Sequence, residues 1–286
     1  SDLARISTLE IAKIQTSKDG TRKILFKLED GNFIESVLMP GNKHWTLCVS
    51  TQVGCRMGCK FCLTGKSGFK RDLLPSEITG QITTLRFDTS LGDNIKTIVL
   101  MGMGEPLENY DNTIKAIRII TSDYGLAFSN RRITLSTCGI APRIYQLGRE
   151  VSVNLAVSLN APSDETRSFL MPINKKYPLE ALIKACREYP MPRRRRLTFE
   201  YILIEGVNAS VEDAKRLAGL LRGVRCKLNL IPFNECPELP FKTPGEKEIE
   251  AFRSVLIKHN FTATVRASRG GDILAACGQL SGRMDI

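Results

Sequence analysis

The sequence has little that would place it in a membrane, outside the cell or in a disordered state. It holds no run of about 18 apolar residues, so no transmembrane helix is predicted. Its first stretch, SDLARISTLEIAKIQTSKDG, is too polar for a signal peptide. Repeats, low-complexity segments and long linkers are missing, and 42% of the residues are hydrophobic, which excludes disordered and collagen-like chains. These absences predict a cytoplasmic globular protein without a membrane partner.

Acidic residues are outnumbered and histidines are scarce, whereas cysteines are plentiful. The 286 residues include 30 Asp and Glu against 41 Lys and Arg, a net charge of +11, with two His and nine Cys. The positive excess favours a polyanionic partner such as nucleic acid, although a merely solubilising surface gives the same balance. An odd number of cysteines in a cytosolic chain argues for metal, redox or nucleophilic chemistry and against a disulfide framework.

Strand-like and helix-like segments alternate along most of the chain. Residues 1–45 predict two strands, 23–28 and 33–39, around an Asp30-Gly31 turn that is typical of a hairpin. Beyond them, apolar segments predict strands and amphipathic segments predict helices. The strands are expected at 46–52, 96–103, 131–139, 153–159, 197–204, 226–233 and 261–268, and the helices at 75–88, 110–121, 141–149, 178–188, 210–222 and 246–259.

These strands are nearly continuous apolar runs, which indicates a parallel sheet covered on both faces. Six βα units exceed a small nucleotide-binding fold but fall short of eight, so we expect an α/β protein with an incomplete (βα)6 barrel. A doubly wound open sheet is the main alternative. The predicted domains are an N-terminal β-hairpin extension over 1–45 and the partial barrel with its C-terminal segment over 46–286. In such a barrel, chemistry takes place at the carboxyl ends of the strands.

A dense group of cysteines follows the first barrel strand. Cys55, Cys59 and Cys62 have the spacing C-x3-C-x2-C. Three thiolates can bind three irons of a [4Fe–4S] cluster and leave the fourth iron open. An open iron can chelate S-adenosylmethionine and reduce it to a carbon radical. A zinc knuckle or redox thiols are the alternatives, but a structural zinc site needs four ligands, and the chain offers only His44 and His259 as histidines.

Several further segments carry a family resemblance. The chain resembles the RlmN/Cfr group of RNA adenine methyltransferases, within the radical S-adenosylmethionine superfamily, from about residue 22 to residue 282. The segments that carry the resemblance are TLCVSTQVGC, CLTGKSGFKRDL, MGMGEPL, LMPINKKYP, CKLNLIPFN and DILAACGQL. It implies a [4Fe–4S] cluster held by Cys55, Cys59 and Cys62, two S-adenosylmethionine molecules per turnover, and an electron donor such as flavodoxin or ferredoxin.

The resemblance also implies which residues bind the cofactor. Taken singly, a Gly-Glu-Pro turn is more often a plain helix entry, and polar residues at strand ends are more often structural. At this chain's positions that match the family motifs, the implied contacts are Gly104, Glu105, Ser136, Ser158, Leu159, Asn160 and Asn234. The chain has Ser158-Leu159-Asn160 where relatives often have Ser-Leu-His, so the contact from Asn160 departs from the family pattern.

Three residues are implied to carry the methyl transfer. Sequence alone suggests that Cys48 is a buried core cysteine and Glu35 an exposed strand residue, and it leaves the role of Cys277 open. The resemblance implies that Cys277 carries the methyl group and becomes joined to the adenine, and that Cys48 then forms a transient disulfide with Cys277. Glu35 is implied to accept the proton from the ring carbon. The remaining cysteines are expected in the core, except Cys236, which is expected to be exposed.

The implied substrates are an adenine in 23S rRNA and, for some members, the adenine next to the tRNA anticodon. The segments Met103-Gly104-Glu105-Pro106 and Arg269-Gly270-Gly271-Asp272 resemble the family members that methylate C2, and therefore favour methylation at C2. The alternatives are methylation at C8, which confers antibiotic resistance, another radical enzyme such as an activase, and a zinc-stabilised RNA-binding protein without catalysis. The family also predicts a small helical domain upstream of Ser1. Candidate RNA contacts are Arg193 to Arg196, Lys60, Lys66, Lys70, Arg71, Arg131, Arg132, Lys175, Lys176, Arg266 and Arg269.

Overall fold

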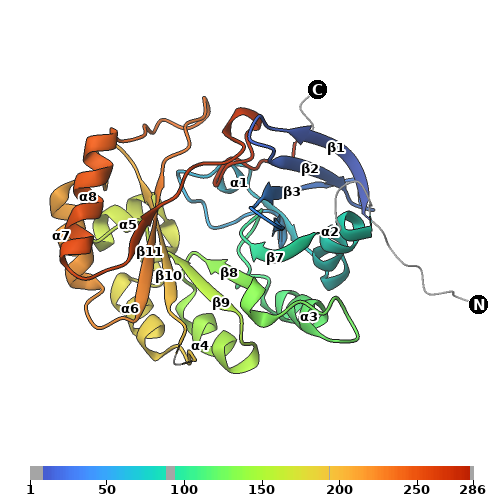
Figure 1. Cartoon of the computed structure of the whole chain (residues 1–286), viewed down its shortest axis with the longest axis horizontal. Helices are drawn as coiled ribbons and strands as arrows, with labels where there is room; N and C mark the ends of the chain where they lie inside the picture. Colours follow the sequence, from blue (N-terminus) through green and yellow to red (C-terminus); the bar gives the residue numbers. More distant parts are fainter. Residues whose placement is uncertain (1–8, 88–93, 193, 284–286) are drawn as a thin grey trace, which may run out of the picture.

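The computed structural model describes residues 9–87, 94–192 and 194–283, and most of its strands belong to one curved sheet (Figure 1). The strand order in this sheet is β1-β2-β3-β4-β7-β8-β9-β10-β11-β12. The strands are β1 (Glu10–Thr16), β2 (Arg22–Lys27), β3 (Phe33–Pro40), β4 (Trp45–Val49), β7 (Ile95–Leu100), β8 (Ile133–Thr137), β9 (Asn154–Ser158), β10 (Leu197–Leu203), β11 (Cys226–Pro232) and β12 (Ala263–Val265).

The N-terminal strands form an antiparallel edge to this sheet. The predicted hairpin is confirmed, since β2 and β3 pair across a turn in which Gly31 has φ +79°. The prediction of only two strands in this region is wrong, because β1 pairs with β2 outside them. Most β1 side chains are exposed, and its sequence EIAKIQT lacks the apolar alternation from which a strand is predicted. The proposed domain boundary between residues 45 and 46 stays a prediction.

Parallel pairing begins at β4 and continues to β12, as the apolar runs predict. All six expected helices are present, at α2 (Pro75–Phe87), α3 (Tyr110–Thr121), α4 (Ala141–Glu150), α6 (Leu179–Glu188), α7 (Val211–Leu220) and α8 (Glu246–Lys258). Among the described residues the sheet has two ends, at β1 and β12. The α/β class with a mainly parallel sheet is confirmed, and closure into a barrel stays a prediction.

Smaller elements around the cysteine loop were not expected. A second sheet pairs β5 (Gln52–Gly54) with β6 (Phe69–Asp72), and the one-turn helix α1 (Leu63–Lys66) lies between them in the chain. Helix α5 (Asp164–Leu170) is preceded by the N-cap residue Ser163, whose side chain accepts a hydrogen bond from the Thr166 amide. Within the described part of the chain, no helix is long and apolar enough to cross a membrane.

The register of the parallel strands determines which polar side chains meet at their carboxyl ends. Ser158 at the end of β9 pairs with Glu200 of β10, and Ser136 of β8 pairs with Ala156 of β9. Because the strands are parallel, these positions lie together at the carboxyl ends of the strands. The C-terminal segment also lies there, beside β1 and β2 (Figure 1).

Candidate functional site

A pocket opens at the carboxyl edge of the parallel strands. Its empty space is about 870 Å³, including open solvent at the mouth. Predicted site residues that line it are Cys55, Cys59, Cys62, Gly104, Glu105, Ser136, Ser158, Asn160 and Cys277. Residues that sequence reasoning did not anticipate also line it, among them Met101, Thr137, Cys138, Glu200, Ile202 and Ile231. The structure therefore brings together residues that lie more than two hundred positions apart in the chain.

The cysteine loop is held by tight backbone contacts. The Cys55 amide donates to the Gly68 carbonyl at 2.9 Å, and Gly54 has φ +75°, where a Cβ would lie only 1.9 Å from the Gly68 oxygen. Cys62 then caps α1. A zinc ion needs all its ligands at about 2.0–2.3 Å. Among the residues that the structure describes, no three His, Cys, Asp or Glu side chains converge closely enough to hold one ion. A cluster in which each thiolate binds its own iron has no such requirement.

The thiols of Cys55 and Cys59 are largely surrounded by protein. Burial raises the pKa of Cys55 to about 12, and burial together with the other two loop cysteines raises the pKa of Cys59 well above its ordinary value. A raised pKa favours the protonated thiol. Metal ions stabilise cysteine as thiolate, so a bound metal cluster would favour the deprotonated form instead. A set of three grouped thiols around an open pocket fits a [4Fe–4S] cluster with one free iron.

Glu105 lies on the pocket wall beside Gly104. Its side chain is 3% exposed, and its oxygens accept hydrogen bonds from the backbone amides of Leu107 at 2.9 Å and Cys138 at 2.7 Å. Burial nevertheless raises the pKa of Glu105. The hydrogen-bond partners of Glu105 named here are uncharged backbone amides, so this buried carboxylate is suited to bind the ammonium group of a ligand.

Ser136 on β8 and Glu200 on β10 form a polar pair across the intervening strand β9. The Ser136 hydroxyl donates to Glu200 Oε2 at 3.0 Å, and burial raises the pKa of Glu200. Sequence reasoning missed Glu200. The available signal was its position as the single charged residue in the apolar run LTFEYILI. A charge in such a strand is costly unless it has a function or a partner.

Two predicted cofactor contacts, Leu159 and Asn160, directly follow β9. Leu159 is fully buried and does not line the pocket. Asn160 has φ +57°, a left-handed conformation that Asn tolerates better than most residues. Its side chain accepts from the Ile202 amide at 2.8 Å and donates to the Met171 sulfur at 3.3 Å. Asn160 therefore fastens the end of β9 to β10 while bordering the pocket.

The segment that carries Cys277 is docked on the cysteine loop. The Leu63 amide donates to the Gly278 carbonyl at 2.7 Å, and the Thr64 hydroxyl donates to the Leu280 carbonyl at 2.6 Å. Asn234 lies outside the pocket lining, and its side-chain amide donates to the Cys277 carbonyl at 3.1 Å. These contacts place Cys277 at the pocket, where the residue stays exposed to solvent while desolvation by the surrounding protein raises the pKa of its thiol to about 11.

Cys48 lies behind the pocket, on β4 between β3 and β7. It is 7% exposed and is not among the lining residues. Burial raises its pKa, and the thiol of Cys277 is the next largest cause. The two cysteines are therefore electrostatic neighbours, although residue 277 is exposed and residue 48 is not.

Glu35 does not line the pocket. One of its oxygens lies 3.2 Å from Lys23 Nζ, and the other accepts the backbone amides of Ser281 at 2.7 Å and Gly282 at 2.9 Å. Glu35 is 2% exposed, so the expectation of an exposed strand residue is wrong. In this arrangement Glu35 binds the chain just beyond Cys277.

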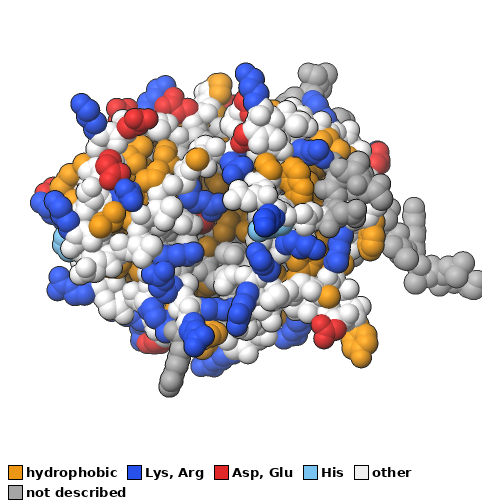
Figure 2. All heavy atoms as spheres, viewed as in Figure 1, with side chains coloured by type: hydrophobic (Ala, Val, Ile, Leu, Met, Phe, Trp, Pro, Cys, Tyr) orange, Lys and Arg blue, Asp and Glu red, His pale blue; other side chains and the backbone are white. Residues whose placement is uncertain are grey.

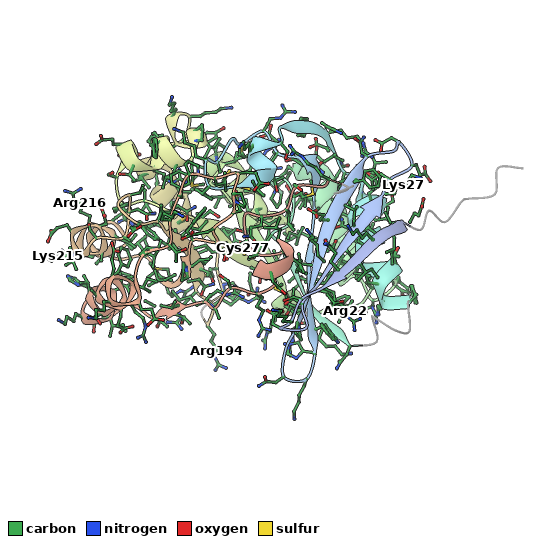
Figure 3. The ribbon with its side chains drawn as sticks, turned by 90° about the horizontal axis from the view of Figure 1, so that it is seen from above. Arg22, Lys27, Arg194, Lys215, Arg216 and Cys277 are labelled. Atoms are coloured by element: carbon green, nitrogen blue, oxygen red, sulfur yellow. The ribbon has the colours of Figure 1, made fainter. Side chains whose placement is uncertain are left out.

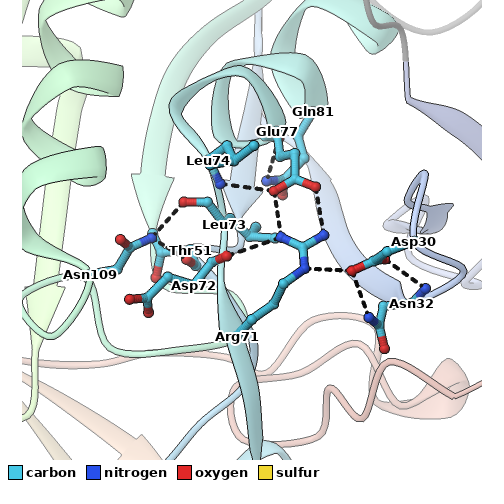
Figure 4. Close-up of polar contacts among 10 residues, drawn as sticks. All are labelled: Asp30, Asn32, Thr51, Arg71, Asp72, Leu73, Leu74, Glu77, Gln81 and Asn109. Atoms are coloured by element: carbon cyan, nitrogen blue, oxygen red, sulfur yellow. Dashed lines mark hydrogen bonds and ion pairs between the residues drawn. The ribbon is translucent and has the colours of Figure 1, made fainter.

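The basic residues near the cysteine loop make different contacts, and those of Arg71 are drawn in Figure 4. Arg71 makes two hydrogen bonds of 2.7 Å to Glu77 and one of 2.5 Å to Asp30, so it links β6 to α2 and to the β2–β3 turn. Lys60 stacks on the ring of Phe169, 3.8 Å from its centroid. Arg266 is exposed near the pocket, where its charge acts on Cys48, Cys277 and Glu200. Arg193 lies outside the described residues.

Comparisons with known proteins agree with this geometry. Residues 49–218 match the family model of the radical SAM superfamily. The chain is 65% identical over 282 residues to the dual-specificity RNA methyltransferase RlmN of Syntrophus aciditrophicus, covering 99% of this chain and 81% of that protein. It is 55% identical over 277 residues to RlmN of Desulfosudis oleivorans, covering 96% and 75%. A radical SAM methyltransferase from Sphaerobacter thermophilus has a similar structure, with 47% identity, a TM-score of 0.93, and coverage of 97% and 82%.

Proposed function

Because this chain belongs to the radical SAM superfamily and, within it, to the RlmN family of dual-specificity RNA methyltransferases, we propose that it methylates C2 of an adenine. The proposed substrates are 23S rRNA and the tRNA position next to the anticodon. The observation that carries this proposal is the meeting of Cys55, Cys59, Cys62, Glu105 and Cys277 around one pocket.

The residues of the pocket have separate tasks in the proposal. The thiolates of Cys55, Cys59 and Cys62 hold the [4Fe–4S] cluster, and Glu105 accepts the ammonium of S-adenosylmethionine. The remaining cofactor contacts are Gly104, Ser136, Ser158, Leu159, Asn160 and Asn234. When bound, cluster and cofactor supply one-electron chemistry and methyl groups. The buried side chains of the pocket wall, among them Phe61 and Met171, limit the access of water to that chemistry.

Cys277 is proposed to carry the methyl group. Its sulfur would take the methyl carbon of one S-adenosylmethionine and lose the thiol proton, while the bond between that carbon and the sulfonium sulfur would break and S-adenosylhomocysteine would leave, so the thioether would be neutral. After the carbon has been joined to the adenine, the Cys48 sulfur loses its proton and bonds to the sulfur of Cys277. The bond between that sulfur and the transferred carbon breaks, and the carbon keeps the electron pair and takes up a proton to become the methyl group of the base. The electrostatic coupling between Cys48 and Cys277 supports this pairing.

Glu35 is proposed as the acceptor of the ring proton. In the present arrangement its carboxylate is occupied by Lys23 and by the amides of Ser281 and Gly282. Proton transfer to Glu35 therefore requires the segment beyond Cys277 to move and release one carboxylate oxygen.

An RNA substrate accords with the charge of the molecule. The net charge is +11, and Lys and Arg side chains gather around a hollow near the middle of one face (Figure 2). Chemistry on a base requires that the base leave its stack, so a loop or an opened helix suits the pocket. A flavodoxin or ferredoxin as electron donor and a cytoplasmic location complete the proposal.

The test is mass analysis of nucleosides after reaction of the anaerobically reconstituted protein with 23S rRNA and with tRNA. We expect 2-methyladenosine from both RNAs, and none with C277A. A product methylated at C8 would replace the C2 assignment by the resistance activity. A colourless protein that holds zinc and leaves both RNAs unmodified would overturn the enzymatic proposal.

A further inference from the structure

Arg167 on α5 is a fully buried cation. Its relative exposure is 0%, and within the described part of the chain it forms no ion pair with a carboxylate. Buried charges are normally paired, because removing an ion from water costs several kcal/mol even after relaxation. An unpaired guanidinium in the interior therefore indicates that a negative group belongs nearby.

The donors of Arg167 are directed at the edge of the sheet where the cofactor is proposed to bind. Nη2 donates to the carbonyls of Cys138 at 2.7 Å and Ser158 at 3.1 Å, and Nε donates to the Leu159 carbonyl at 3.1 Å. These carbonyls follow β8 and end β9. Cys138 is also the residue whose amide donates to Glu105. Arg167 thus fixes the backbone of Cys138, whose amide binds the Glu105 carboxylate, and the backbone of Ser158 and Leu159.

Asn174 supports Arg167 without neutralising it. Its side-chain oxygen accepts from Arg167 Nη1 at 2.9 Å, and its Nδ2 donates to Asp164 Oδ1 at 2.9 Å. A neutral amide therefore stands between the guanidinium and the nearest acidic side chain of this network. This contact gives a structural role to the segment LMPINKKYP, which contains Asn174.

The cysteine loop packs directly on α5. The Lys60 amide donates to the Leu170 carbonyl at 2.9 Å, and Met57 and Phe61 share one apolar cluster with Leu170 and Met171. Burial lowers the pKa of Arg167, and the thiols of Cys138 and, to a smaller extent, Cys59 counteract this lowering, so both lie within electrostatic range of the guanidinium. The unpaired charge consequently lies beneath the loop of the proposed cluster ligands.

We propose that Arg167 is a positioning residue of the cofactor site, whose buried charge balances the cluster thiolates while its donors fix the ends of β8 and β9. This inference rests on the proposed function, in which Cys55, Cys59 and Cys62 hold the cluster. Net charge and nearby dipoles set the reduction potential of such clusters. Loss of a neighbouring cation disfavours the reduced, more negative form.

The experiment compares iron content and midpoint potential in reconstituted wild type, R167Q, R167K and N174D. R167Q keeps hydrogen-bond donors without charge, and we expect a more negative midpoint potential and fewer irons per chain. R167K keeps the charge, and we expect a potential close to wild type with weaker binding of S-adenosylmethionine. N174D gives Arg167 a carboxylate partner and should also make the potential more negative. It carries the test if R167Q does not fold.

R216Q is the matched control, because Arg216 is exposed on α7 at the far end of the molecule from Cys277 (Figure 3). Its potential and iron content should equal those of wild type. Equal potentials in wild type and in the neutralised variants that fold would overturn the inference and leave the proposed function intact. A shift in R167K as large as in R167Q would overturn the role of the charge. A wild type without iron would instead overturn the proposed function, and this inference with it.

Discussion

Lys23 and Glu35 form an ion pair inside the protein, with 3.2 Å between Nζ and the carboxylate and with side-chain exposures of 7% and 3%. The two residues lie on the neighbouring strands β2 and β3. Glu35 also accepts the amides of Ser281 and Gly282, so the pair connects the N-terminal hairpin to the chain just beyond Cys277. The hairpin thereby holds the segment that carries the proposed methyl acceptor.

Removing the cation of this pair should destabilise the protein. K23M leaves the Glu35 charge buried with two amide donors, and breaking a buried pair in this way costs about 3 kcal/mol. Urea unfolding of K23M, E35Q and the double variant measures the effect. The double variant should be more stable than the sum of the single losses predicts, because neither charge is then left alone. A loss below about 0.5 kcal/mol in K23M would contradict a buried pair, since that is the range of exposed pairs.

This pair illustrates what local sequence patterns cannot predict. The alternation of apolar and amphipathic segments predicted the parallel strands and their helices, and the cysteine spacing pointed to the loop at the pocket. Lys23 and Glu35 have no neighbouring residues that reveal their partner, and β1 lacks an apolar face. The contacts of Glu200 and Arg167 are with Ser136 and Cys138, which are distant in the sequence. Only the folded sheet brings these residues together, so local sequence patterns do not predict the contacts.

Replacing Cys48 should stop the reaction after the RNA has been joined to Cys277. C48A cannot form the proposed disulfide, so a covalent RNA–protein adduct should accumulate and be visible as a slower band in a denaturing gel. C186A is the matched control, because Cys186 is also buried but lies on α6 outside the pocket lining. Full turnover by C48A without an adduct would exclude the resolving role.

Gly104 should tolerate no side chain. Its φ is +99°, and a Cβ would lie 2.5 Å from the Gln52 Cβ, while the Gln52 side chain accepts the Glu105 amide at 2.8 Å. G104A should therefore displace Glu105 and weaken S-adenosylmethionine binding at least tenfold in calorimetry, which corresponds to about 1.4 kcal/mol. G219A is the control, since a Cβ there meets nothing within 4 Å and an alanine favours the helix. Unchanged affinity in G104A would show that this turn does not position the cofactor.

Arg266 should contribute to RNA binding, whereas Arg216 should not. Arg266 is exposed beside the pocket, and Arg216 is exposed on the distant helix α7 (Figure 3). If Arg266 contacts a phosphate, R266A should weaken RNA binding and reduce the slope of log affinity against log salt by about 1. R216A should leave both quantities unchanged. The same salt slope in R266A and wild type would remove Arg266 from the RNA-binding surface.

The stability of the protein should fall at alkaline pH, in part because of Cys186. Burial raises the pKa of this thiol from 9.0 to about 12 in the folded chain. Between these two values the unfolded chain loses the proton while the folded chain keeps it. The stabilisation is therefore complete below about pH 9 and is lost as the pH rises toward the folded pKa, with a slope of about 1.4 kcal/mol per pH unit for one group.

Urea unfolding of wild type and C186A in the presence of a thiol reductant, from pH 8 to pH 11, tests this prediction. C186A lacks the titrating thiol, so its free energy of unfolding should decrease less steeply above pH 9 than that of wild type. The difference between the two proteins should be constant below pH 9, where it reports only the lost packing of the sulfur. Parallel curves across the whole range would mean that the thiol ionises equally readily in both states, and that α6 does not shield it from water.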